Sequence, residues 1–150
     1  MQFGSVNEVL DFAIAREEEA VEFYTDLAGK MDQPAVRRMF DAFAGEERGH
    51  KAKLLAIKNG KLLAPAARKV MDLKIADYTV DVEPTPDLDY QGALVLAMKK
   101  EKAAFRLYTN LAEAAGDEKL RATLQVLAQE EAKHKLRFEI EYDDHVLAEN

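Results

Sequence analysis

Cysteine is absent from this 150-residue chain, which also lacks long hydrophobic runs and an excess of positive charge. Without thiols the chain can form no disulfide, no iron–sulfur cluster and no zinc site with thiolate ligands. It has no hydrophobic run that approaches a membrane span and no leader-like N-terminus, so we expect a cytoplasmic protein without a membrane partner. The net charge of −7 argues against a nucleic-acid partner.

Helical periodicity, in contrast, extends over most of the chain and predicts an all-α fold. Ser5 and Glu8 form a capping box at the start of the first helix, and Gly29 is a candidate residue for its end. Pro34 suits the first turn of the second helix. The four expected helices span approximately residues 5–29, 33–59, 89–116 and 117–142.

The connection between the second and third helices is long, at about residues 60–88. Two X-Pro steps, at Pro84 and Pro86, favour extended backbone, so residues 76–88 are expected to be non-helical. One long crossover between two short loops is typical of ferritin-like bundles. We therefore predict a single domain, an antiparallel four-helix bundle in which helical hairpins of about residues 5–59 and 89–144 flank the crossover.

The two hairpins resemble each other at a fixed offset of 84 residues. Residues 9–54 align without a gap on residues 93–138 and share 14 identities in 46 positions. Unrelated helices of ordinary composition would share about three or four. The chain therefore looks like two copies of one helical hairpin, packed about a pseudo-two-fold axis.

Each copy carries the same three polar residues at positions expected in the core. The first helix of each hairpin has one glutamate on its apolar stripe, beside small alanines and a tyrosine. The second helix has Glu-x-x-His, whose two side chains lie on one face at i, i+3. The six candidate metal ligands are Glu17, Glu47, His50, Glu101, Glu131 and His134.

Buried carboxylates cannot stay charged alone, since burial of an unpaired charge is very costly. Two divalent cations would bring four positive charges against four glutamates, with the histidines neutral. This is the known pattern of di-iron and di-manganese carboxylate proteins. Oxygen-rich ligands with a few imidazoles suit iron or manganese, although zinc can occupy such a site by affinity alone. We expect two iron ions.

These motifs resemble the rubrerythrin family, in particular its stand-alone ferritin-like members. The marks are Glu-x-x-Ala-x-x-x-Tyr, from Glu17 and Glu101, and Glu-Glu-x-x-His, ending at His50 and His134. The resemblance covers about residues 5–140. It implies an antiparallel bundle, a di-iron site that reacts with hydrogen peroxide or dioxygen, and the six residues above as metal ligands. It further implies that Glu47 and Glu131 bridge the two metals.

The chain departs from typical rubrerythrins in two ways. Those proteins have a cysteine-ligated iron domain that supplies electrons, so this cysteine-free chain would need a separate electron-donor protein. They also carry an extra glutamate one turn beyond the third-helix ligand, where this chain has Ala104. The site is therefore similar to a bacterioferritin ferroxidase centre. Arg48 stands where bacterioferritins place a haem-binding methionine, and we expect no haem.

Other polar and aromatic residues lie near the candidate ligands in the sequence. Tyr24 and Tyr108 recur at the same distance from Glu17 and Glu101, as core aromatics or as hydroxyl donors to a ligand carboxylate, and we favour the catalytic role. The first-helix acids Glu18, Glu19 and Glu22 have no acidic counterparts in the second copy and are expected to face solvent, as is His145 in the acidic tail.

Three functions are consistent with this pattern. The first is reduction of hydrogen peroxide, with the ligand glutamates as catalytic residues and electrons from the separate donor. The second is ferroxidation with iron binding or storage, and the third, less favoured, is hydroxylation of an organic substrate. We expect a homodimer or a higher homo-oligomer.

Overall fold

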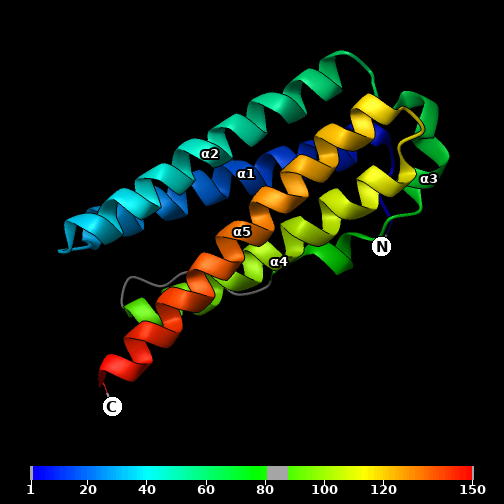
Figure 1. Ribbon diagram of the computed structural model, residues 1–150. Coiled ribbons are helices and arrows are strands. Elements are labelled where there is room, and N and C mark those ends of the chain that lie inside the picture. The colour runs from blue at the N-terminus through cyan, green and yellow to red at the C-terminus, as the bar shows by residue number, and fades with distance from the viewer. Residues whose placement is uncertain (1, 81–87, 150) are drawn as a thin grey trace. The chain divides into compact units, whose positions relative to one another are not determined.

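The computed structural model describes residues 2–80 and 88–149, with side chains as far as residue 145. Within these ranges the chain is helical and has no β-strand, apart from an isolated bridge between Gln2 and Lys74. The helical elements, shown in Figure 1, are α1 (Val6–Lys30), α2 (Pro34–Asn59), η1 (Ala64–Ala66), α3 (Ala67–Met71), η2 (Ile75–Tyr78), α4 (Tyr90–Ala114) and α5 (Glu118–Glu149).

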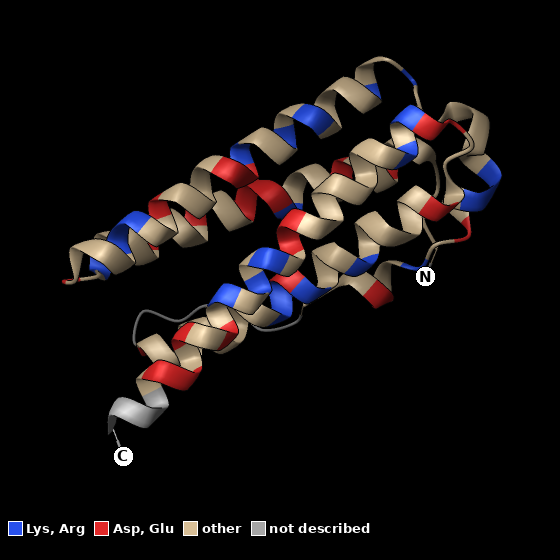
Figure 2. Cartoon of the chain, viewed as in Figure 1, with Lys and Arg blue, Asp and Glu red and all other residues tan. Residues whose placement is uncertain are grey.

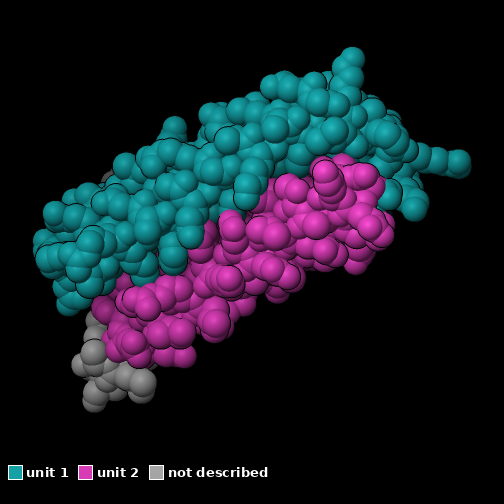
Figure 3. All heavy atoms as spheres, turned by 45° about the horizontal axis from the view of Figure 1, so that its top comes forward, with its two compact units in different colours: residues 1–74, 114–116 teal, residues 75–113, 117–150 magenta. Residues whose placement is uncertain are grey.

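The chain divides into two compact units that follow the predicted hairpins. Unit 1 contains residues 1–74 with 114–116, and unit 2 contains residues 75–113 with 117–150 (Figure 3). Unit 1 therefore holds α1, α2 and the short helices η1 and α3. Unit 2 holds η2, nearly all of α4, and α5.

The hairpin of unit 1 begins with the predicted capping box. The Ser5 hydroxyl accepts a hydrogen bond from the Glu8 amide at 3.1 Å, and the Glu8 carboxylate accepts one from the Gly4 amide at 3.1 Å. These contacts satisfy amide groups that the first helical turn cannot pair internally. The helix then continues through Gly29 and ends at Lys30, so the predicted stop at glycine is early by one residue.

Apolar contacts and ion pairs hold α1 against α2. The Tyr24 ring stacks on Phe40 with ring centroids 6.2 Å apart and is edge-on to Phe43. Nearer solvent, Lys51 of α2 lies 2.9 Å from the Glu18 carboxylate of α1. Burial of large aromatic surface supplies most of the stability here, because exposed ion pairs typically contribute less than about 1 kcal/mol.

The hairpin of unit 2 has a polar anchor where the start of α4 meets the last turns of α5. The Tyr90 hydroxyl donates to Glu141 at 3.2 Å, and the Gln91 amide donates to the Tyr142 hydroxyl at 3.1 Å. The Tyr90 ring is also edge-on to His145, with ring centroids 5.2 Å apart. These partners lie about 50 residues apart in sequence, so they tie the two helices together.

Two segments differ from the sequence prediction. Residues 76–78 lie in η2, where non-helical backbone was expected, because the buried Tyr78 is anchored by a hydrogen bond from Asn110 at 2.7 Å. Helix α5 continues to Glu149, beyond the predicted end near residue 142, and His145 is half-buried against Tyr90 rather than exposed. The proline steps of the crossover lie outside the described residues.

The described helices are not of the kind that spans a membrane. Every one of them is either too short or too polar to cross a bilayer.

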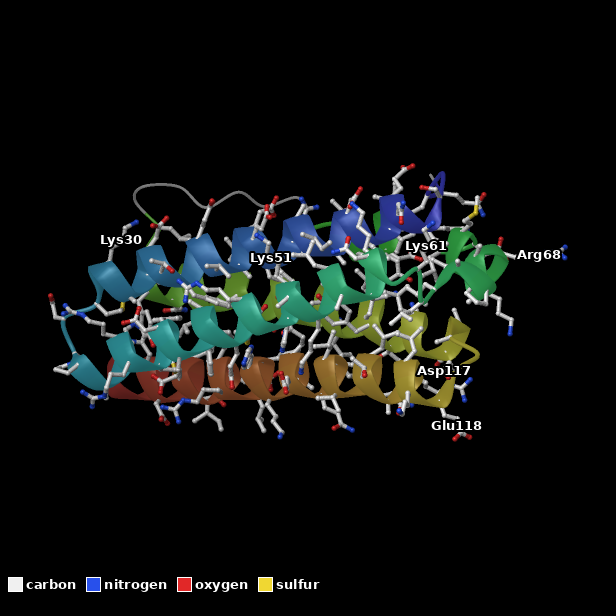
Figure 4. The ribbon with its side chains drawn as sticks, turned by 90° about the horizontal axis from the view of Figure 1, so that it is seen from above. Lys30, Lys51, Lys61, Arg68, Asp117 and Glu118 are labelled. Carbon is white, nitrogen blue, oxygen red and sulfur yellow. The ribbon has the colours of Figure 1, made fainter. Side chains whose placement is uncertain are left out.

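We predict that the two hairpins differ in how strongly their second helix is capped. Asp117, at the start of α5 (Figure 4), accepts a hydrogen bond from the Leu120 amide at 2.9 Å, whereas its repeat counterpart Gln33 makes no side-chain cap. Asp117→Ala should therefore lower the free energy of unfolding by about 1 kcal/mol, measured by urea denaturation. The matched change Gln33→Ala should have a much smaller effect, and equal losses would contradict the capping role.

Candidate metal centre

Unit 1 brings three of the predicted ligands together in its core. Glu17 lies in the middle of α1, and Glu47 and His50 lie one turn apart on α2. His50 Nδ1 is 3.2 Å from Glu47 Oε1 and 3.7 Å from Glu17 Oε2. One ligand atom from each residue lies within 4.8 Å of the others, and all three residues are 1% exposed. We call this group half-site 1.

Helical spacing explains why half-site 1 forms. Glu17 shares its face of α1 with Ala13 and Ala20, both buried, whose small side chains leave space beside the carboxylate. On α2 the i, i+3 spacing points Glu47 and His50 the same way, toward α1. The two helices need only pack on their apolar faces to bring the three polar groups together.

The electrostatics of half-site 1 favour bound protons in the metal-free protein. Burial, together with the nearby charge of Glu47, raises the pKa of Glu17 to about 8, although its bond to His50 opposes the rise. Burial alone would lower the pKa of His50, but the carboxylates of Glu17 and Glu47 outweigh it and raise that pKa to about 11. Near neutral pH, half-site 1 therefore holds two protons more than it would with both glutamates ionised and the histidine neutral. Their two positive charges equal the charge of one divalent cation.

Unit 2 repeats the arrangement as half-site 2. Glu101 lies in the middle of α4, and Glu131 and His134 lie one turn apart on α5. His134 Nδ1 is 3.6 Å from Glu101 Oε1 and 3.9 Å from Glu131 Oε1. Ligand atoms of the three residues again lie within 4.8 Å of one another, and the exposed fractions are 1–3%. All six predicted ligands are thus buried, three in each unit.

The donor set of each half-site fits a divalent transition metal. Two carboxylates and one imidazole offer two negative charges and three ligating groups, which leaves coordination positions open. Carboxylate and imidazole ligands suit iron, manganese and zinc, while the absence of thiolate makes the site poor for softer metals. Buried carboxylates at this density require positive charge, as protons or as metal.

The two tyrosines predicted to assist the site are both buried, Tyr24 in unit 1 and Tyr108 in unit 2. Tyr24 lies two turns beyond Glu17 and has its ring against Phe40 and Phe43. Their catalytic role stays a prediction.

One feature of the surroundings was not anticipated from the sequence. Glu18, next to the predicted ligand Glu17, is solvent-facing as predicted, but it also pairs with Lys51 across the hairpin. The counterparts at an offset of 84 are Lys102 and Lys135, so the second copy has two lysines where the first has an ion pair. Lys135 pairs instead with Glu139 on its own helix. The repeat offset shows from the sequence that the first of these positions differs in charge between the two copies. Only the packing of α1 on α2 shows that Glu18 and Lys51 face each other.

Comparison with known proteins gives two findings. The family model described as Rubrerythrin matches residues 8–142 of the chain. A solved structure from Thermotoga maritima, provisionally described as a ferritin-like diiron-carboxylate protein, has a TM-score of 0.81 and 20% sequence identity, covering 97% of this chain and 99% of that chain. This likeness confirms the predicted fold class, an all-α ferritin-like bundle. Among curated proteins, the comparison found no match.

The raised pKa of Glu17 predicts how the metal-free protein responds to pH. Folded Glu17 keeps its proton up to about pH 8, whereas an unfolded glutamate loses it near 4.5. The folded state therefore binds more protons between these values, and this contribution to stability, complete below pH 4.5, is lost as pH rises toward 8. Glu17→Gln should remove that loss, measured as unfolding free energy against pH. The exposed control Glu19→Gln should behave as wild type, and an unchanged slope in Glu17→Gln would contradict the assignment.

Proposed function

Because the chain belongs to the rubrerythrin family, we propose that its two half-sites together hold two iron ions and that it reduces hydrogen peroxide. The observation that carries this proposal is the duplicated, buried set of one glutamate and one Glu-x-x-His in each hairpin. A single Glu-x-x-His on a helix would be weak evidence. Two copies, each close to a core glutamate, form the donor set of a two-metal carboxylate site.

Charge supports two metal ions rather than one. Four buried glutamates carry four negative charges when ionised, and two divalent cations neutralise them with both histidines as neutral ligands. One cation would leave two carboxylates that must be protonated or unpaired, and the latter is costly in the core. In the proposed centre, Glu47 and Glu131 would contribute to holding both ions, as the family resemblance implies.

Peroxide reduction needs two electrons and two protons, and it yields two molecules of water. When bound, two ferrous ions would supply one electron each and Lewis-acid assistance. The chain's own residues hold the ions in a buried position, which keeps bulk water away from the reaction. We propose that the Tyr24 and Tyr108 hydroxyls donate to ligand carboxylates and so orient them. The chain has no cysteine that could ligate a second iron centre, and we propose that a separate donor protein returns the electrons.

Ala104 supports a second candidate, a ferroxidase of the bacterioferritin type. This residue is half-buried one turn beyond Glu101, where typical rubrerythrins carry an additional glutamate. Without that carboxylate the two half-sites supply equal donor sets, as in a ferroxidase centre that oxidises ferrous iron with dioxygen. In this alternative, iron is the substrate and no electron donor is needed.

Stopped-flow oxidation distinguishes the two functions. Protein loaded without oxygen with two ferrous ions per chain is mixed with hydrogen peroxide or with dioxygen at equal concentration, and formation of ferric iron is followed by absorbance. We expect oxidation by peroxide to be faster by about tenfold or more, a difference of about 1.4 kcal/mol in the barrier. Faster oxidation by dioxygen would support the ferroxidase, and no oxidation by either would reject both.

Metal stoichiometry tests the proposed ligands independently of turnover. Wild-type protein should bind two ferrous ions per chain in anaerobic titration calorimetry. Loss of a residue that only hydrogen-bonds to a metal ligand typically weakens metal binding by about 10–100-fold. Glu101→Ala removes a proposed ligand itself, so it should weaken the binding of one of the two ions by more than this. The matched control is Glu113→Ala, an exposed glutamate of the same helix, which should still bind two. Two tightly bound ions in Glu101→Ala would rule out this ligand set.

A further inference from the structure

Basic residues gather on unit 2, beside half-site 2. Residues 99–106 of α4 and 133–137 of α5 contain seven lysines and arginines and one acidic residue, the buried Glu101. Two of the seven, Lys135 and Arg137, also pair with Glu139 and Glu141 one turn further along α5. Figure 2 shows these blue positions together along the middle of α4 and α5. We define the basic patch as these seven residues, all of them exposed or partly exposed, namely Lys99, Lys100, Lys102, Arg106, Lys133, Lys135 and Arg137.

The repeat shows that the hairpin does not need this charge in order to fold. The counterpart of residues 99–106 is residues 15–22, which contain one arginine and four glutamates including the ligand Glu17. The two copies therefore share their ligands and helix packing but have opposite charge on the first helix. In a chain with a net charge of −7, this makes the patch a local exception. Such a field steers a partner more than it stabilises a fold.

Exposed apolar side chains lie among these basic residues. Phe105 is 38% exposed on α4, and Leu136 and Ile140 are 57% and 45% exposed on α5. A surface groove with a volume of about 630 Å³ adjoins Phe105 between the two helices, lined also by Thr109 and Gln125. Apolar contact area with a charged rim is the usual composition of a protein-binding surface, and weak electron-transfer encounters use the smallest such surfaces.

We propose that the basic patch docks a small acidic protein that carries single electrons and reduces the iron centre. This inference rests on the proposed function, which requires an external donor. Two donor molecules each lose one electron and two ferric ions each gain one, so no proton or other reactant is consumed. Lys102 and Lys135 directly follow Glu101 and His134 in sequence, so the patch lies within about one helix diameter, about 10–12 Å, of half-site 2.

Charge selects the partner class. The rest of the chain is acidic and repels an acidic protein, so the basic patch is where such a protein meets attraction. The long-range part of this attraction is screened beyond about 8–10 Å at physiological salt, so association should slow as salt rises.

The test uses flavodoxin, a small acidic protein that carries single electrons, as the probe. Lys102→Glu with Lys133→Glu reverses two charges of the patch without touching a ligand. The matched control, Arg48→Glu with Lys53→Glu, makes the same change in total charge at two exposed positions of α2. Binding of oxidised flavodoxin to the metal-free proteins is measured by titration calorimetry. Reduction of the ferric protein by reduced flavodoxin is followed by stopped flow, with dithionite as the small-molecule reference.

We expect the patch reversal to weaken flavodoxin binding and slow iron reduction by about 10–100-fold. Reduction by dithionite, a small anion that needs no docking surface, should change much less. The control should stay within about twofold of wild type. Lys102→Arg with Lys133→Arg should bind as wild type, which separates loss of charge from loss of folding.

Three outcomes would overturn the docking inference. Wild type does not bind flavodoxin, the patch reversal binds it as well as wild type does, or wild type sediments as an oligomer that the reversal dissociates. The last outcome would mean that a second copy of the chain covers the patch. Since binding is measured without metal, a protein that binds flavodoxin at the patch yet fails to reduce peroxide would reject the proposed function and leave the docking surface in place.

Discussion

Burial of carboxylates is the constraint on which the rest of the structure depends. Each hairpin places two glutamates and one histidine, all at most 3% exposed, between two apolar helix faces. Ionised carboxylates there need compensating positive charge, and in the metal-free protein the raised pKa values of Glu17 and His50 show where half-site 1 obtains it. A core that needs two extra positive charges in this half-site is suited to exchange two protons for one divalent cation.

Long helices follow from the same constraint. A ligand in the middle of a helix is shielded from water only if apolar turns extend on both sides of it, and α1, α2 and α4 each provide 25 or 26 residues. The short loops then return the chain, so that the Glu-x-x-His of the second helix meets the glutamate of the first. Because one hairpin completes half a donor set, duplication is a direct route to a two-metal site.

The outside of the two hairpins is under no such constraint, and there the copies diverge. Glu18 and Lys51 form an ion pair in unit 1, while the equivalent positions in unit 2 are Lys102 and Lys135. Exposed pairs contribute little to stability, so these positions can change without loss of the fold. The surface of one hairpin can therefore diverge while both cores keep the same buried glutamates and histidine.

The sequence by itself determined the helices, the repeat and the six candidate ligands, because these depend on local spacing. Capping by Ser5, the i, i+3 pairs and the offset of 84 residues are all visible without a fold. Tertiary structure alone decided the rest: the η2 turn held by Tyr78 and Asn110, the extension of α5 against Tyr90, and the shifted pKa values. Each of these depends on contacts between residues distant in sequence or on burial, and neither follows from helical periodicity.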